Sequence, residues 1–188
     1  MGLSVTWASC NIGASNPEDY GDYYAWGETE TKSNYSWSTY KFGTSSSGPF
    51  SKYNTYSLCG TVDNKTFLEP EDDVAHVKLG GKWRMPTDAE WTELRNTDNC
   101  TWTWTTQNGV YGRLVTSKKT GNSIFLPAAG DRNTGYLYNT GSDGLYWSSS
   151  LYTYTYPNFA WYVGFNSDFV GRGDFDRFNG LSVRPVSK

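Results

Sequence analysis

Helical periodicity in this chain is confined to about residues 70 to 96, a small share of its 188 residues. Aromatic residues make up 18% of the chain, and there are 20 glycines. Because aromatic side chains favour sheets and glycine marks turns, this combination excludes a helical bundle. The length supports one domain with one sizeable core, or at most two small ones. We therefore expect an α+β fold for residues 1–188, taken as a single domain.

The first expected helix begins at Pro70, a residue that the first helical turn tolerates, and it ends at Gly80-Gly81. Its apolar positions predict one buried stripe, formed by Val74, Val77 and Leu79.

The second expected helix starts at Thr87, which can form a capping box with Glu90 three residues later. Trp91 and Leu94 lie three residues apart and so share one face of that helix. We expect this face to pack against the sheets.

After Tyr111 the pattern changes to short strands separated by glycine-containing turns. These strands are expected at 112–116, 123–127, 145–149, 159–165 and 181–186. They predict antiparallel sheets on which the two helices pack, connected by long loops. The stretch 34–56 is rich in Ser, Thr, Tyr and Gly without periodicity, and we expect it to be a long surface loop.

The charge pattern narrows the classes of partner. The net charge is -3 and the sequence pI is about 5.1, so no basic surface for a phosphate backbone is expected, and hence no nucleic-acid partner. No apolar run approaches the roughly 18 residues of a spanning helix, so direct membrane insertion of this chain is not expected.

Residues for catalysis or metal binding are sparse. His76 is the only histidine, and the GxSxG, P-loop, GxGxxG and HExxH patterns are missing, so we expect neither an enzyme nor a cofactor. Clustered carboxylates in loops are more often solvated than metal-bound, and we predict no metal site. The three cysteines are too few and too scattered for a zinc site or a disulfide framework, and their pairing stays open; they are Cys10, Cys59 and Cys100.

The last third of the chain has an unusual composition. Residues 146–186 contain no Lys, Glu, Gln, Met, His, Cys or Ile, and they use mainly Tyr, Asn, Ser, Gly, Asp, Arg and Phe. Antibody paratopes use a similar set, in which Tyr provides rigid contact area and Ser, Gly and Asn provide adaptable hydrogen bonds. This segment is therefore predicted to be a recognition surface.

Within this segment we expect two kinds of position. The alternating tyrosines at 152, 154 and 156 would share one side of an extended segment, and the run 171–178 interleaves Gly and charge with Phe too closely for one buried face, so both are expected to be exposed. The core of the sheet is expected to take Trp147, Trp161, Val163 and Phe165.

Six ordered motifs cover nearly the whole chain: 3–14, 20–28, 83–91, 125–130, 146–150 and 182–186. They resemble the paralogous surface-protein domain of gut bacteria, which has a C-type lectin fold of the formylglycine-generating-enzyme-like subclass. The resemblance implies that fold, and it also implies a C-terminal domain of a longer protein.

A subset of that family serves as the variable protein of diversity-generating retroelements, in which adenine-directed mutagenesis rewrites codons near the C-terminus. Mutation of AAC codons cannot produce Lys, Glu, Gln, Met or Trp, which agrees with most of the missing residue types. The resemblance implies a variable region at 146–186 that ends in an invariable stretch at 180–186. The diversified, ligand-binding positions would be Tyr152, Tyr154, Tyr156, Phe159, Tyr162, Gly164, Asp168, Phe169, Gly171, Gly173, Asp174, Phe175, Asp176 and Phe178.

The expected function is thus non-catalytic ligand binding of receptor or adhesin type, through a hypervariable C-terminal surface. The partner would be a protein or another cell-surface ligand, and the domain would be displayed on a cell surface, exported as part of a longer protein, or carried on a phage particle. Stability would come from the tryptophans outside the variable positions, at 7, 26, 83, 91, 102, 104, 147 and 161.

Two alternatives stay open. One is an undiversified carbohydrate-binding module of the same fold, in which Tyr152, Tyr154 and Phe175 present flat faces to sugar rings. The other is an enzyme that kept the fold and changed its chemistry. The related formylglycine-generating enzymes use paired cysteines near the C-terminus, and no cysteine follows Cys100 here. The segment 69–71 is similar to the Glu-Pro-Asn of calcium-dependent lectins but lacks the Trp-Asn-Asp partner, so we predict no calcium site.

Overall fold

The computed structural model describes residues 1–188 and is mostly β-structure with two α-helices, which confirms the expected combination of elements. The helices are α1 (Val74–Leu79) and α2 (Asp88–Arg95), and short 3₁₀ turns occur at Trp37–Thr39, Ser57–Cys59 and Pro70–Asp72. The strands are β1 (Thr6–Trp7), β2 (Trp83–Arg84), β3 (Cys100–Gln107), β4 (Val110–Ser117), β5 (Ser123–Pro127), β6 (Asp131–Asn133), β7 (Tyr136–Tyr138), β8 (Gly144–Leu151), β9 (Phe159–Phe165), β10 (Val170–Asp176) and β11 (Val186–Ser187).

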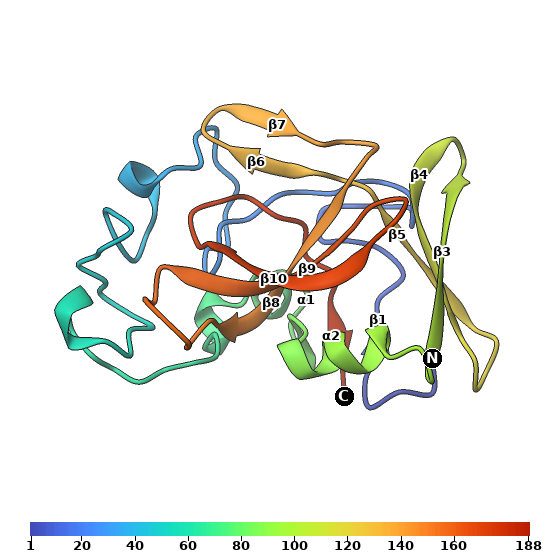
Figure 1. Ribbon diagram of the computed structural model, residues 1–188, viewed down its shortest axis with the longest axis horizontal. Coiled ribbons are helices and arrows are strands. Elements are labelled where there is room, and N and C mark those ends of the chain that lie inside the picture. The colour runs from blue at the N-terminus through green and yellow to red at the C-terminus, as the bar shows by residue number, and fades with distance from the viewer.

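The strands form four small sheets with antiparallel neighbours: β10-β9-β8, β3-β4-β5, β1-β11-β2 and the hairpin β6-β7. In Figure 1 the β8–β10 sheet crosses the middle of the molecule, with β3–β5 on one side and the β6–β7 hairpin above it. The strands β1 and β11 pair with each other, so the two ends of the chain lie close together.

Two hydrophobic clusters form the core, and they meet at β8. Trp147 belongs to the larger cluster, with Trp26, and Tyr146 belongs to the smaller one, with Trp91. Consecutive residues of a strand point to opposite faces, so β8 is covered on both sides. The β8–β10 sheet is therefore fixed from two directions.

The two helices differ in how well the sequence predicted them. In α2 the capping box between Thr87 and Glu90 is present, and Trp91 and Leu94 are buried, as expected. The prediction for the first helix was wrong in part, because its buried residues are Val74 and Ala75. Neither helix is long and apolar enough to cross a membrane.

The prediction of a buried stripe on the first helix was wrong at the C-terminal end of that helix. Val77 and Leu79 are 46% and 50% exposed, because α1 is only six residues long and contacts the core through its first turn. That turn is held by Asp73, whose side chain accepts hydrogen bonds from the N–H groups of Ala75, His76 and Met85.

The strands at 123–127 and 159–165 agree with β5 and β9, and those at 112–116 and 145–149 lie within β4 and β8. The strand expected at 181–186 was wrong, because that segment crosses the core with isolated bridges and pairs regularly only at β11. Strands β3 and β10 were not predicted, and in β10 glycine and charge obscure the strand pattern.

The stretch 34–56 is irregular, as expected, but it is not confined to the surface. Its aromatic side chains at 35, 40, 42, 50 and 53 are buried. Four of them, Tyr35, Tyr40, Phe42 and Tyr53, join the larger cluster beside Trp26, which leaves polar Ser and Thr residues to face solvent. This loop therefore contributes a wall of the core, and the expectation of a surface loop was wrong for these positions.

Candidate ligand-binding surface

The antiparallel pair β9–β10 carries most of the predicted site residues. The register places Trp161 opposite Asp174 and Tyr162 opposite Gly173. Because neighbouring residues of a strand point to opposite faces, Trp161, Arg172 and Asp174 share one face, while Tyr162 and Phe175 share the other.

Four aromatic side chains meet on the first of these faces, and we call them the aromatic patch: Tyr152, Tyr154, Phe159 and Trp161. The ring of Tyr152 is central, at centroid distances of 5.5 Å from Tyr154, 6.1 Å from Phe159 and 4.8 Å from Trp161. Edge-to-face contacts of this kind stabilise one arrangement of the rings. The patch thus offers a defined apolar surface, of which Tyr154 is 73% exposed.

Arg172 adds a positive charge to the aromatic patch. Its guanidinium carbon lies 4.3 Å from the centroid of the Trp161 ring, and its Nη1 lies 2.6 Å from Oδ2 of Asp88 at the start of α2. The expected burial of Trp161 was wrong in part, because its ring is half-buried and covered from outside by this arginine. The guanidinium keeps further N–H donors for a ligand.

A cleft of about 360 Å³ opens beside the aromatic patch, between α2 and the segment around Phe67. Phe67 is 55% exposed. The cleft is lined by Thr66, Phe67, Thr87, Asp88, Ala89, Ser150, Leu151, Thr153 and Trp161. It combines apolar walls with hydroxyl and carboxylate groups, the mixture that ligand sites use.

The opposite face of β9–β10 is built around Tyr162. A Cβ atom at Gly164 or Gly173 would lie 2.9 or 2.8 Å from the Tyr162 ring, so the ring rests on both glycines. The Tyr162 and Phe175 rings lie 5.7 Å apart and pack at the edge of the larger cluster. Burial, followed by the nearby Asp174 charge, raises the pKa of Tyr162.

The turn between β9 and β10 presents two predicted site residues to solvent, Asp168 and Phe169. Its shape is fixed by Asn166, whose side-chain oxygen accepts hydrogen bonds from both of their N–H groups at 2.9 Å. The Arg113 side chain donates to the carbonyl of Asn166 from the neighbouring sheet. The Phe169 ring covers Gly171, which is why that glycine is buried.

The expected exposure of the run 171–178 was wrong for Arg177, which is fully buried. Its guanidinium carbon lies 4.5 Å from the ring centroid of Phe50 and 5.4 Å from those of Trp26 and Tyr40. Nη1 donates a 2.8 Å hydrogen bond to the carbonyl of Tyr53. Burial lowers the pKa of Arg177. This arginine holds the end of β10 against the 34–56 loop.

Phe178 and Asp176 are only half-buried beside that arginine. The Phe178 ring lies 5.1 Å from the Trp37 ring of the loop. Asp176 accepts a 2.9 Å hydrogen bond from the Asn158 side chain, and burial, which outweighs that bond, raises the pKa of this carboxyl. Both residues therefore line the margin of the core.

The predicted site residues consequently fall into three groups. The exposed ones are Tyr154, Tyr156, Asp168, Phe169 and Asp174. The half-buried ones are Tyr152, Phe159, Tyr162, Gly164, Gly173, Phe175, Asp176 and Phe178, and the buried one is Gly171.

The three tyrosines at 152, 154 and 156 do not share one side of a strand, because residues 152–158 form a loop. Tyr152 and Tyr154 join the aromatic patch, whereas Tyr156 contacts Tyr56 at a centroid distance of 5.5 Å. Phe67, Asp88 and Arg172 were missed as site residues, since the first two come from distant parts of the chain. For Arg172, the charge between two glycines was the available signal.

His76 and the three cysteines make no hydrogen bond to one another. The Nδ1 atom of His76 lies 3.3 Å from the carbonyl oxygen of Trp83, at the corner between α1 and β2. None of the three cysteines is in a disulfide, and two of them are buried.

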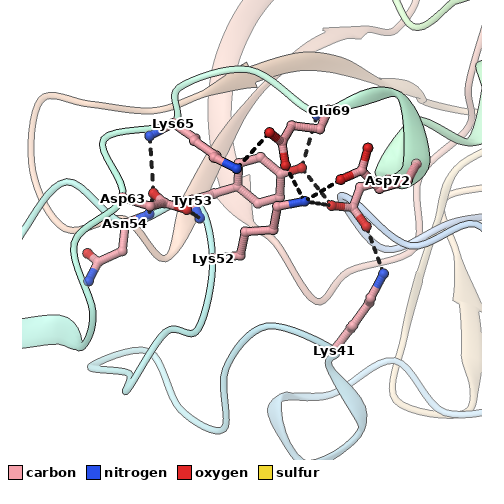
Figure 2. A network of polar contacts seen from close by, with 9 residues as sticks. Lys41, Lys52, Tyr53, Asn54, Asp63, Lys65, Glu69 and Asp72 are labelled. Carbon is pink, nitrogen blue, oxygen red and sulfur yellow. Dashed lines mark hydrogen bonds and ion pairs between the residues drawn. The ribbon is translucent and has the colours of Figure 1, made fainter.

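The acidic residues at 69, 71 and 72 converge on one ammonium group, that of Lys52 (Figure 2). Its Nζ lies 2.5 Å from a carboxylate oxygen of Glu69, 3.1 Å from one of Glu71 and 2.5 Å from one of Asp72. Asp72 is buried and also receives Lys41 at 2.7 Å. The positive charge that these carboxylates require is thus supplied by lysine side chains.

This network changes the acidity of its carboxyls. Hydrogen bonds from Lys52, then from Lys65, lower the pKa of Glu69 to about 2. Burial alone would raise the pKa of Asp72, but Lys41, Lys52 and the Tyr53 hydroxyl outweigh it and lower that pKa. A carboxyl whose pKa is lowered by folding stabilises the protein above its unfolded pKa, and this stabilisation is lost as the pH falls through its folded pKa.

We predict that Lys52→Met destabilises the protein by about 2 kcal/mol at pH 7, because it removes a partner from the buried Asp72 carboxylate. The difference from the wild type should shrink as the pH falls below about 4, where the unfolded carboxyls are protonated. Urea unfolding between pH 7 and pH 2 measures this. Lys65→Met, which removes only the half-exposed pair with Glu69, is the control with a smaller effect. An equal effect of Lys52→Met at all pH values would contradict the assignment.

The chain was also compared with known proteins. No protein-family model, no curated protein and no solved structure matches it. The function therefore has to be argued from the residues of this surface.

Proposed function

We propose that this protein is a non-catalytic ligand-binding domain of receptor or adhesin type, whose C-terminal surface is diversified by a retroelement to recognise varied targets. The observation that carries the proposal is the aromatic patch beside Arg172. It gathers rigid aromatic side chains, a cation and a neighbouring cleft on one surface. Aromatic and arginine side chains are the residues that most often dominate binding energy in protein interfaces.

A partial separation between the core and the proposed variable positions supports diversification, although Tyr162, Phe175 and Phe178 also pack against the larger cluster. Exposed positions such as Tyr154, Phe169 and Asp174 alternate along the chain with buried ones such as Val163 and Phe165. Substitution at the exposed positions leaves the two core clusters complete. A domain that tolerates many side chains at one surface needs this arrangement.

We further propose a C-type lectin fold of the formylglycine-generating-enzyme-like subclass. Support comes from the positions of the six motifs, which supply buried side chains such as Trp7, Trp26, Trp91, Trp147 and Arg184. The segments that resemble the family are therefore the ones that build the core. On this proposal the domain is displayed on a cell surface or a phage particle, and its ligand is a protein or another surface molecule.

Diversification by a retroelement predicts a particular arrangement of genes. A near-copy of the codons for residues 150–186, differing only at adenines, should lie close to a reverse-transcriptase gene. Sequencing of the genomic neighbourhood measures this. If both are missing, diversification by a retroelement is excluded and only an undiversified binding domain is left.

The exposed and the core-packed site residues should contribute differently to the free energy of unfolding. Tyr154→Ser with Tyr156→Ser should change the free energy of unfolding by less than about 0.5 kcal/mol per site, because both side chains are exposed. Phe175→Ser with Phe178→Ser should cost about 2 kcal/mol or more, because both rings pack against the larger cluster. Denaturant unfolding of the two double variants compares them directly. A large loss in the tyrosine variant would show that the surface supports the fold.

The carbohydrate-binding alternative is favoured by one observation, the exposed phenol rings of Tyr154 and Tyr156, 73% and 55% accessible. If the ligand is a glycan, a glycan array should show binding by the wild type and loss of binding in Tyr152→Ala with Tyr154→Ala. Tyr136→Ala with Tyr138→Ala, two exposed tyrosines of β7 that lie outside the predicted site, is the matched control. If the ligand is a protein, the array stays negative for the wild type.

A further inference from the structure

Strand β10 lies at the edge of its sheet, with β9 as its only strand neighbour. Two hydrogen bonds fix which of its backbone groups point inward. The Asn166 N–H donates to the Phe169 carbonyl and the Arg177 N–H to the Asn158 carbonyl, each at 3.0 Å. Hydrogen-bonded pairs recur every second residue in an antiparallel ladder, so positions 171, 173 and 175 bond to β9. The backbone groups at 170, 172, 174 and 176 therefore point away from the sheet.

Few of these outward groups have a partner within the chain. The Asp176 carbonyl accepts from the Asn179 N–H, but neither the N–H nor the carbonyl of Arg172 or Asp174 takes part in a hydrogen bond outside the β9–β10 ladder. Both residues are exposed. Unpaired donors and acceptors at strand spacing are a template for another strand.

Strand β3 is also an edge strand, in the neighbouring sheet. At the edge of β3, the N–H of Cys100 donates to Asn96 and the carbonyl of Trp102 accepts from the Arg113 side chain. The chain thus satisfies part of the β3 edge itself. The outward backbone groups of Trp104 and Thr106 on β3 have no partner outside their ladder, as those of Arg172 and Asp174 on β10 have none, and β10 differs in carrying opposite charges at these two positions.

We infer that the β10 edge binds a second copy of this chain, in an antiparallel pair centred on Gly173. In that register Arg172 of each copy lies opposite Asp174 of the other. The backbone N–H and carbonyl groups of both residues point away from β9, toward the second copy. Two such pairs provide four backbone hydrogen bonds, and opposite charges face each other twice. The sequence Arg-Gly-Asp at 172–174 is self-complementary only about this centre.

The side chains permit this pairing. Arg172 uses Nη1 for Asp88 and stacks on Trp161, which leaves its other guanidinium N–H groups for the second copy. Asp174 has no hydrogen-bond or ion-pair partner in its own chain, which agrees with a role between copies. Gly173 adds no side chain at the two-fold axis.

The pairing has a consequence for the binding surface. A two-fold axis perpendicular to the sheet keeps the same face of both copies on the same side, so β8–β10 of two chains would form one continuous six-stranded sheet. The two aromatic patches would then lie on one face of the dimer. Two linked sites can bind a repetitive surface more strongly than either site alone. Gly173 and Asp174 are themselves among the proposed diversified positions, so this charge pairing belongs to the present sequence and would change in variants that carry other residues there.

The test is sedimentation equilibrium of the wild type and three variants at concentrations up to about 0.1 mM, because small interfaces of this kind bind weakly. Asp174→Arg places like charges opposite each other and should weaken the dimer at least ten-fold. The double variant Arg172→Asp with Asp174→Arg exchanges the charges and should restore it. Asp174→Pro removes an outward N–H without affecting the β9 ladder and should also abolish the dimer.

Amide hydrogen exchange tests the register independently. Protection of the Arg172 and Asp174 N–H groups should rise with protein concentration, while the inward N–H of Gly173 stays protected throughout. A wild type that remains monomeric overturns the inference and leaves the edge for a strand of another protein. A dimer that is insensitive to both Asp174 variants also overturns it, since it must then use another surface. Thermal unfolding of each variant confirms that loss of the dimer is not loss of the fold.

Discussion

The structure depends on the burial of β8 between the two core clusters and on three indole groups that bond around it. The Trp26 indole donates to the carbonyl of Ser148 at 2.8 Å, and the Trp91 indole donates to that of Trp147 at 3.2 Å. The Trp147 indole in turn donates to Tyr24 at 2.8 Å. Each of these bonds gives a buried indole N–H a backbone acceptor, and the Tyr24 carbonyl also accepts from the Leu181 N–H. The strands β9 and β10 extend outward from this fixed strand, and this is why a surface can be presented on them with a defined shape.

The two buried arginines connect the C-terminal segment to the rest of the chain on either side of that sheet. Arg177 inserts among aromatic rings of the 34–56 loop, whereas Arg184 donates to the carbonyls of Ala8, Ser9 and Phe125. A buried charge is costly without partners, so each arginine fixes the segments that supply them. All the proposed variable positions except Phe178 lie between β8 and Arg177, and substitution there therefore changes a segment whose two ends are anchored.

Several of the helices and strands could be predicted from the sequence, because interactions between residues close together in the chain determine them. The capping box at Thr87 and the regular apolar strands at 123–127 and 159–165 depend on neighbours within a few residues. The aromatic side chains of 34–56 could not be placed, because only contacts with distant segments such as β10 bury them. The strand β10 was missed for a related reason: its glycines serve to accommodate the Tyr162 and Phe169 rings, which a linear pattern does not reveal. At the candidate surface, Tyr152 and Tyr154 could be predicted, whereas Phe67 and Asp88 join them only through the fold.

The pairing of β1 with β11 determines how the domain responds to mechanical load. Thr6 lies opposite Ser187 and Trp7 opposite Val186, so the two ends of the chain leave the same end of one antiparallel ladder. Tension applied to both ends pulls these strands apart one hydrogen bond at a time, because the bonds run perpendicular to the strands. Tension between one end and a ligand held on β9 or β10 follows a different path, through the buried arginines and the indole bonds of β8. The fold should therefore resist a force applied at the β8–β10 sheet better than a force that separates the two ends of the chain.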